Sequence, residues 1–498
     1  MYKKRIQEQI TFFDYNQGFG IPINEDNRWV QLAKKIPWDE IEEKYATQFG
    51  ETGMPAIPAR VALGALMIRR IMHLSDRGTV KAIQEGPYLQ YFLGMERYTD
   101  KPPFDDSLMS TFRKRFDLDA MGEITDLVIE YEKKTGMQGG KNSANNTETD
   151  EKYCTEKGAV DLPAAEEVEP SIQRGAEQIT RGILSGKTTR KEAMAAGANF
   201  GDLIIDATCC PVNIRYPQDF SLLNEAREKL ESMLNRISKL SSQKKPRTYA
   251  RVARKEYLNL AKSKKRSRKK IRHVVRIMLN CIKRNLRYLK RYLRAGHSLT
   301  CKEEREIGVI RSLYVQQKEM YEANKNRVDH RIVSLHMPFI RPIMRGKVPT
   351  PTEFGPKIDL TVDESGNMRI SHFSYEAYNE SVHLIEAIEE YKNRTGCYPE
   401  RVLADTIYRN KKNRDYCKER GIQMSGPKLG RPSNSDEIQQ EQKKKEMQDM
   451  VDRIEVERRF SRQKRCFGLD LIMEKREDTI GSSVGLAVLL DNVVPIGF

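Results

Sequence analysis

The chain lacks the cysteine pattern of a disulfide-rich or zinc-binding domain. Its eight cysteines include no CxxC pair and no zinc-like spacing with the seven histidines, which favours a reducing compartment. It also lacks a signal peptide, because the first residues, MYKKRIQEQITFFDYNQ, contain no apolar stretch. No segment reaches the roughly 18 apolar residues of a membrane span, and the best candidate, Val484 to Val494, is interrupted by Asp491. We therefore expect a cytoplasmic protein with no membrane partner.

Hydrophobic residues are few for a chain of this length. They make up 38% of the 498 residues, against 32% that are charged, so the protein is polar. The length still allows two to four domains, each with its own core.

Positive charge is concentrated in one stretch. Between Lys244 and Arg294 the chain has 21 Lys and Arg but one acid, Glu256, so the rest of the chain is slightly acidic although the net charge is +17. Such a block predicts a polyanion partner, nucleic acid first and anionic membrane second, with a solvated helix face as the alternative. The residues expected on phosphates are Lys264, Lys265, Arg266, Arg268, Lys269 and Lys270.

The N-terminal part reads as a helical module. RVALGALMIRRIMHL has helical spacing of apolar residues, Ser75 and Asp76 mark a turn, and a further helix begins at Asp106 or Ser107. This helix carries Arg113, Lys114 and Arg115, and the arrangement resembles helix-turn-helix DNA binders. A packing or dimerisation module is the alternative. We assign residues 1–132 to this domain and residues 133–196, rich in Gly, Ser, Asn, Thr and Glu, to a flexible acidic linker.

Strand and helix patterns alternate through residues 197–498. GDLIIDATCC predicts a buried strand ending on Asp206, and RVLAD predicts a second one ending on Asp405. Between them lie a helical excursion over about 222–345, a β-hairpin formed by EFGPKIDLTV and NMRISHFSY, and a helix from Ser381 to Lys392. IQMSG and a long polar helix, capped by Ser433 or Ser435, follow. The order predicts an α/β fold with a mixed sheet and helices on its faces.

Three residues of that last helix share one face. At about 100° per residue, Arg453 lies roughly 40° and Lys464 roughly 20° from Glu457, whereas Glu455 points the opposite way. An acid between two cations suits a site that handles a metal and a phosphate together. An ordinary surface salt-bridge helix is the alternative.

The three acids Asp206, Asp405 and Glu457 become informative as a set. If the two strands are neighbours and the late helix crosses them, the carboxylates meet and repel one another, so divalent cations are their natural partner. Two Mg²⁺ ions about 3.5 to 4 Å apart, with Mn²⁺ as a substitute, support phosphoryl transfer. Each aspartate alone could equally be a turn residue.

The chain resembles the DDE transposases of bacterial insertion sequences. The resemblance is carried by the N-terminal helical module, by LIIDATCCPVNIRYPQDFSLLNEARE, by VLADTIYRNKKNRDYCKERGIQMSGPKLGRP and by VERRFSRQKRCFGLDL. The spacing of Arg453, Glu457 and Lys464 fits the family pattern Y-x2-R-x3-E-x6-K, in which Met450 here replaces the tyrosine.

This resemblance implies a ribonuclease-H-like catalytic domain interrupted by the basic helical insertion. It also implies binding of terminal inverted repeats, cutting of DNA and joining of the freed 3′-OH to target DNA. Asp206, Asp405 and Glu457 would be the catalytic metal ligands, and Arg453 and Lys464 would hold phosphates. A homodimer or higher oligomer on double-stranded DNA, in the bacterial nucleoid, is then expected.

Tyr408 follows the second aspartate, where it would pack beside the site or stack on an extruded base. Two other functions stay open from the sequence: a metal-dependent nuclease of the same fold, and an inactive transposase-derived DNA-binding protein.

Overall fold

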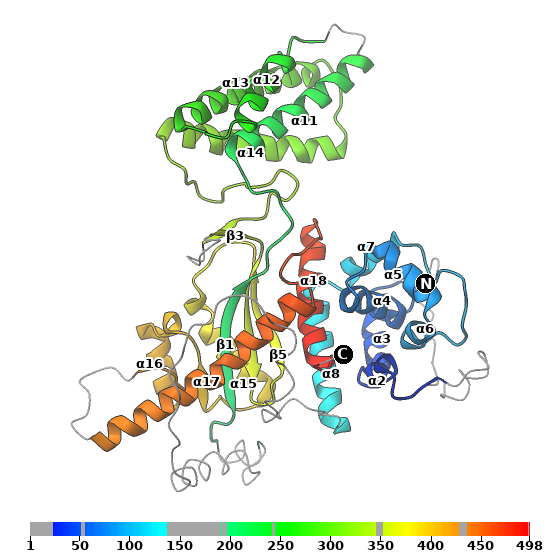
Figure 1. The fold of residues 1–498 in the computed structure, drawn as a ribbon, viewed down its shortest axis with the longest axis vertical. Helices are drawn as coiled ribbons and strands as arrows, with labels where there is room; N and C mark the ends of the chain where they lie inside the picture. The colour runs from blue at the N-terminus through cyan, green and yellow to red at the C-terminus, as the bar shows by residue number, and fades with distance from the viewer. Residues whose placement is uncertain are drawn as a thin grey trace.

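The computed structural model describes residues 23–50, 55–136, 190, 197–241, 245–344, 352–427, 436–496 and 498. A mixed sheet lies at its centre, N-terminal helices pack to one side, and a helical unit projects from one end (Figure 1). The predicted linker lies outside the described residues except for 133–136 and 190. The two serines proposed as a helix cap, Ser433 and Ser435, also lie outside them.

The five-stranded sheet has the order β5-β4-β1-β6-β7. Its centre is β1 (Asp202–Cys209), which pairs antiparallel with β4 (Lys357–Asp363) and parallel with β6 (Arg401–Leu403). The predicted hairpin is confirmed, because β4 pairs antiparallel with β5 (Met368–Ser374). The edge strand β7 (Gln423–Met424) runs parallel to β6. The strand that contains Asp206 and the strand that precedes Asp405 are therefore neighbours.

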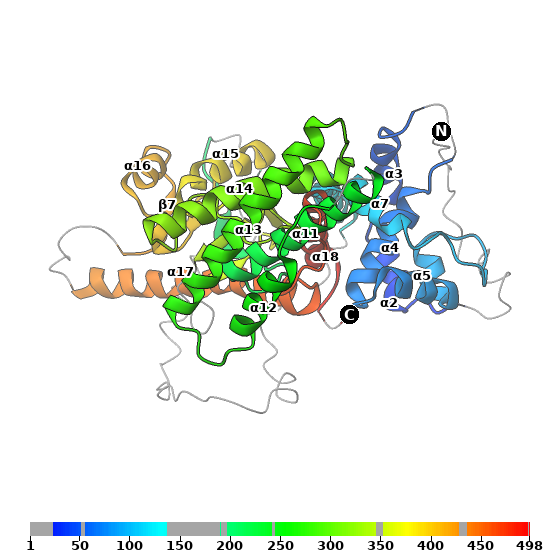
Figure 2. The same ribbon diagram turned by 90° about the horizontal axis from the view of Figure 1, so that it is seen from above.

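Helices cover both faces of this sheet, as the two views show (Figures 1 and 2). On one face, α15 (Leu384–Thr395) and α16 (Lys411–Glu419) pack on a core that includes Leu203, Ile205 and Val402. On the other face, α17 (Asp436–Cys466) and α18 (Glu477–Val493) pack on Ile204, Leu360 and Val362. β1 is apolar on both faces because both are covered.

The N-terminal helices are α2 (Arg28–Lys34), α3 (Trp38–Ala46), α4 (Ala59–Ile71), α5 (Asp76–Glu85), α6 (Pro87–Phe92), α7 (Leu108–Arg115) and α8 (Leu118–Thr135). They do not form an isolated module. Their core is continuous with that of the sheet through α18, which packs on α8, α7 and α4. The buried Arg70 guanidinium donates hydrogen bonds to the carbonyls of Gly468 and Ser483. One side of this N-terminal segment therefore packs on the rest of the protein, as the packing alternative from the sequence proposed.

The predicted excursion from the sheet is a helical unit with a core of its own. It comprises α11 (Asp219–Leu240), α12 (Ala250–Ala261), α13 (Arg268–Arg294) and α14 (Cys301–Ala323). Ser267 caps α13, and a Thr300–Glu303 capping box begins α14. The chain returns through the small sheet of β2 (Pro342–Met344) and β3 (Thr352–Phe354).

The most apolar helix, α18, is an internal helix. Every residue from Thr479 to Val493 is buried, including Asp491, whose carboxylate contacts Arg459 at 2.6 Å and Arg462 at 3.1 Å. None of the helices in the described ranges is both long and apolar enough to cross a bilayer.

Candidate active site

Asp206 lies within β1 and not at its end, which corrects the expectation from the sequence. The strand continues to Cys209 because β4 pairs with it along its whole length, with Asp206 opposite Leu360. On its other side, the pairing with β6 stops at Ile204 opposite Leu403. Asp206 therefore lies on a rigid central strand, two residues beyond the last pair that this strand forms with β6.

Asp405 lies at the same level. It is two residues past Leu403, as Asp206 is two residues past Ile204, so the parallel register brings the two acids to the same end of the β1–β6 pairing. Asp405 caps the short helix η2 (Thr406–Tyr408), and its Oδ1 accepts hydrogen bonds from the backbone N–H of Thr406 at 2.6 Å and from its hydroxyl at 3.3 Å. About half of its side chain is exposed, which leaves it open to a ligand.

Arg453 of α17 connects the second and third predicted acids. Its Nη1 lies 3.5 Å from Asp405 Oδ1 and its Nη2 lies 3.8 Å from Glu457 Oε1. The buried Val456 anchors this stretch of α17 on the core, and the two contacts of Arg453 place Glu457 on the same side of the helix as Asp405. Glu455 instead pairs with Arg458. Lys464 lies two turns further along α17 and is partly buried.

The electrostatics of Asp206 indicate an uncompensated negative site. Burial raises the pKa of this carboxyl to about 6, and the negative charges of Glu380 and Asp405 act in the same direction. The hydrogen bond from the backbone N–H of Ala207 and the charge of Arg453 oppose the rise. A buried carboxylate with other acids nearby suits a divalent cation, and oxygen donors suit Mg²⁺ or Mn²⁺.

The three acids nevertheless stand apart in this structure. Among the described residues, the group of His, Cys, Asp or Glu whose ligand atoms lie within 4.8 Å of one another is His372, His383 and Glu386, not the predicted set. Arg453 fills the space between Asp405 and Glu457, as expected where like charges would otherwise repel. The donor types fit a pair of divalent cations, and binding them requires the side chains to close inward.

A second buried acid next to the site is absent from the sequence-based prediction. Asp359 of β4 is fully buried and accepts a hydrogen bond from the Tyr378 hydroxyl at 2.6 Å, while its Oδ2 has no partner among the described residues. Nearby, Glu380 pairs with Lys357 at 2.6 Å. An aspartate in the middle of an apolar strand pattern, KIDLTV, was the signal that could have revealed it.

Tyr408 lies among these acids. Its ring is fully buried in the core under α15, as expected for a packing residue, and its hydroxyl has no partner among the described residues. Burial raises the pKa of this phenol far above its usual range, with Asp359, Glu380, Asp206 and Asp405 adding to the shift.

Asp359→Asn is expected to stabilise the metal-free protein at neutral pH. Burial raises the pKa of Asp359 to about 6 from an ordinary 3.8, so the folded state loses stability as pH rises through this window and the acid ionises. The amide can still accept from Tyr378. At about 1.4 kcal/mol per pKa unit, the variant should gain about 3 kcal/mol at pH 7.5 and almost nothing near pH 4. Thermal unfolding in a chelator at both pH values measures this; equal gains at both would contradict it.

The predicted basic residues of the excursion are all exposed. Lys264 and Lys265 lie in the α12–α13 connection, and Lys269 and Lys270 lie in the first turn of α13. In the described part of the chain no acid pairs with these four lysines. Arg266 instead donates to the Ala261 carbonyl at 2.7 Å, and Arg268 donates to Asn324 Oδ1 at 2.9 Å, so these two also hold the helical unit together.

The expected basic edge of the N-terminal module is partly wrong. Arg113 is buried and binds the Asp76 carboxylate with both Nη atoms, at 2.9 and 2.6 Å, because α7 packs against the start of α5. Lys114 is exposed. Arg115 donates to the Tyr45 hydroxyl at 3.0 Å and stacks over Phe49. Only Lys114 of the three extends freely from the surface.

Comparisons with known proteins agree with the motifs. Residues 402–493 match the family described as Transposase DDE domain, and residues 20–115 match the family described as Transposase domain (DUF772). A Rhizobium meliloti protein named Uncharacterized protein ORF8 in nfe locus is 32% identical over 114 residues, which are 23% of this chain and 55% of that protein. The chain thus spans about half the length of this relative. No solved structure matches. The resemblance to DDE transposases is confirmed.

Proposed function

We propose that this chain, which carries a transposase domain in its N-terminal part and a DDE domain in its C-terminal part, is the DNA transposase of a bacterial insertion sequence. It would bind terminal inverted repeats and catalyse metal-dependent cleavage and joining of DNA strands. The observation that carries the proposal is the level register of Asp206 and Asp405 on paired strands, with Arg453 reaching from α17 to both Asp405 and Glu457.

The catalytic domain is assigned to the ribonuclease-H-like fold. Support comes from a five-stranded sheet in which β4 and β5 are antiparallel and β6 and β7 run parallel to the central β1. The acids on β1 and just after β6, with the third on a helix across the same face, fit a site built on rigid elements.

The roles of the residues follow from their positions. Asp206, Asp405 and Glu457 would hold two Mg²⁺ ions, which when bound supply activation of an attacking oxygen and stabilisation of a leaving one. Arg453 lies beside two of these acids, so its guanidinium is placed to donate hydrogen bonds to a phosphate oxygen once the carboxylates turn to the cations. Lys464, two turns further along α17, would contact the DNA strand.

The proposal is tested by supplying the purified chain with a pre-cut inverted-repeat end, a target plasmid and Mg²⁺ or Mn²⁺. Joined products support a transposase. Hydrolysis without joining would make the protein a nuclease of the same fold, and binding without either reaction would make it an inactive DNA-binding derivative.

The helical excursion is proposed to clamp DNA through its exposed lysines. The first turn of α13 contains Arg268, Lys269 and Lys270 and no acid, although a helix N-terminus already carries positive partial charge. Cations at this end cost stability unless an anion neutralises them, and phosphates provide that anion.

Changing Lys264, Lys265, Lys269 and Lys270 to Gln should weaken DNA binding and flatten its salt dependence. Each lost phosphate contact reduces the slope of log K against log salt by about 0.9, so four contacts change it by roughly 3 to 4. Arg266 and Arg268 stay unchanged because they hold the unit together. A matched control replaces Lys133, Lys134, Lys443 and Lys444, which are exposed on α8 and α17, outside the excursion. An unchanged slope in the first variant would exclude the clamp.

A further inference from the structure

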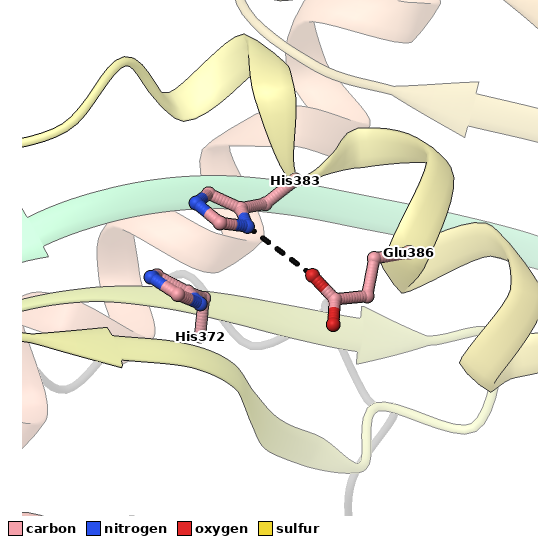
Figure 3. A group of neighbouring side chains, drawn as sticks. All are labelled: His372, His383 and Glu386. Carbon is pink, nitrogen blue, oxygen red and sulfur yellow. Dashed lines mark hydrogen bonds and ion pairs between the residues drawn. The ribbon is translucent and has the colours of Figure 1, made fainter.

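Three potential metal ligands gather on the α15 side of the sheet (Figure 3). His372 comes from β5, His383 immediately precedes α15, and Glu386 lies in the first turn of that helix. One ligand atom from each lies within 4.8 Å of the other two, and His383 Nδ1 is 3.2 Å from Glu386 Oε2. Two of the seven histidines in the chain therefore lie in this cluster.

Packing holds the two imidazole rings close together, and a shared ion would require the rings to turn until a nitrogen of each points at it. The rings of His372 and His383 stack with centroids 3.6 Å apart and an angle of 17°. The Tyr378 ring packs nearly perpendicular to both, at 4.7 and 5.1 Å. Figure 3 shows the two rings side by side, each with a ring nitrogen on the side of Glu386.

Stacked rings at this distance favour neutral imidazoles, because two imidazolium charges would repel. A neutral imidazole offers a nitrogen lone pair, which is the form that binds metals.

We infer that His372, His383 and Glu386 form a binding site for a divalent transition-metal ion, Zn²⁺ first, separate from the carboxylate site. Two imidazoles and one carboxylate are the protein ligands of a three-ligand zinc site, whereas Mg²⁺ prefers oxygen donors throughout. His383 and Glu386 are three residues apart, so the start of a helix presents both on one side. Glu386 is 61% exposed, which gives the ion a path from solvent.

Such an ion would brace the segment that leads to the candidate active site. It would tie β5 to α15 on both sides of residues 375–382, which contain Tyr378 and Glu380. Tyr378 donates to Asp359, and the charge of Glu380 acts on Asp206. The inference does not depend on the proposed function, because it rests on the histidine cluster alone.

The test uses the full chain after a chelator has removed bound metal. Co²⁺ is added in the presence of excess Mg²⁺, and binding is measured from the visible absorption of bound Co²⁺. Zn²⁺ is then added to displace the Co²⁺. The unchanged protein should bind one ion that Mg²⁺ does not displace. His372→Ala and His383→Ala should each bind at least about 100-fold more weakly, and Glu386→Gln should also bind more weakly. Circular dichroism establishes that each variant is folded.

Two controls separate this site from others. His330→Ala removes a histidine that also pairs with a glutamate, Glu376 at 3.1 Å, but has no second histidine beside it, and it should bind Co²⁺ normally. A chain with Asp206→Asn and Asp405→Asn should keep the Co²⁺ spectrum while losing any Mg²⁺-dependent DNA joining. Absence of Co²⁺ binding by the unchanged protein, or an identical spectrum in a folded His372→Ala variant, would overturn the inference.

Discussion

An Asp206→Asn variant is expected to lose strand joining by at least about a thousandfold while binding transposon-end DNA as tightly as the unchanged protein. The amide keeps the shape of the side chain and can still accept from the Ala207 N–H. It removes the negative charge that a cation needs, and no neighbouring group on β1 can replace it. Joining of pre-cut ends and DNA affinity in the same buffer are the two measurements.

We do not expect loss of the fold to cause this effect. Because burial raises the pKa of Asp206 to about 6, removing its charge should leave the metal-free protein at least as stable at pH 7.5. Glu457→Gln and Glu455→Gln form a matched pair on α17: the first should lose joining, and the second should not, since Glu455 pairs with Arg458. A fully active Asp206→Asn variant would refute the metal-site assignment.

An Asp491→Asn variant should be destabilised by about 3 to 5 kcal/mol, the usual cost of breaking a buried ion pair. The Asp491 carboxylate is fully buried and contacts Arg459 and Arg462, which hold α17 to α18. Without this carboxylate, the guanidinium groups of Arg459 and Arg462 remain in the interior, and the negative charge that balances them is lost. The midpoint of thermal unfolding should fall by roughly 3 to 5 °C, as measured by calorimetry, because the entropy of unfolding grows with chain length.

The matched control for this prediction lies in the same helix. Asp478, in the first turn of α18, pairs with Arg476 at 2.7 Å, but both side chains are well exposed. Water and salt screen such a pair, so Asp478→Asn should cost no more than about 1 kcal/mol. Similar losses in both variants would mean that burial of Asp491 contributes nothing special.

The carboxylates illustrate what local pattern can reveal. Apolar runs that end on Asp206 and Asp405 indicated strands, and helical spacing separated Glu457 from Glu455, whose partners in the structure are indeed different. The sequence did not predict Asp359 as part of the site, because its burial beside β1, Tyr378 and Tyr408 depends on the folded chain and not on spacing along it. The proximity of His372 and His383 was not predicted for the same reason, since a strand and the start of a helix meet only in the folded chain.

The N-terminal module shows the limit of amphipathic pattern. A helix face rich in apolar residues predicts burial but not the partner that covers it. Here α18, near the other end of the chain, covers it, and Arg70 reaches a carbonyl 398 residues away. Arg113 looked like part of a basic edge because its neighbours in sequence are basic, yet Asp76 is its partner in space.

The amino-acid sequence by itself determined the kinds of elements in this protein, the concentration of positive charge in one excursion and the choice of acids, because periodicity and local charge are properties of neighbouring residues. Only the tertiary structure decided that β1 lies beside β6, that Arg453 stands between two of the acids and that a histidine cluster forms behind them. These features join residues far apart in the chain, and strand register and core packing bring them together.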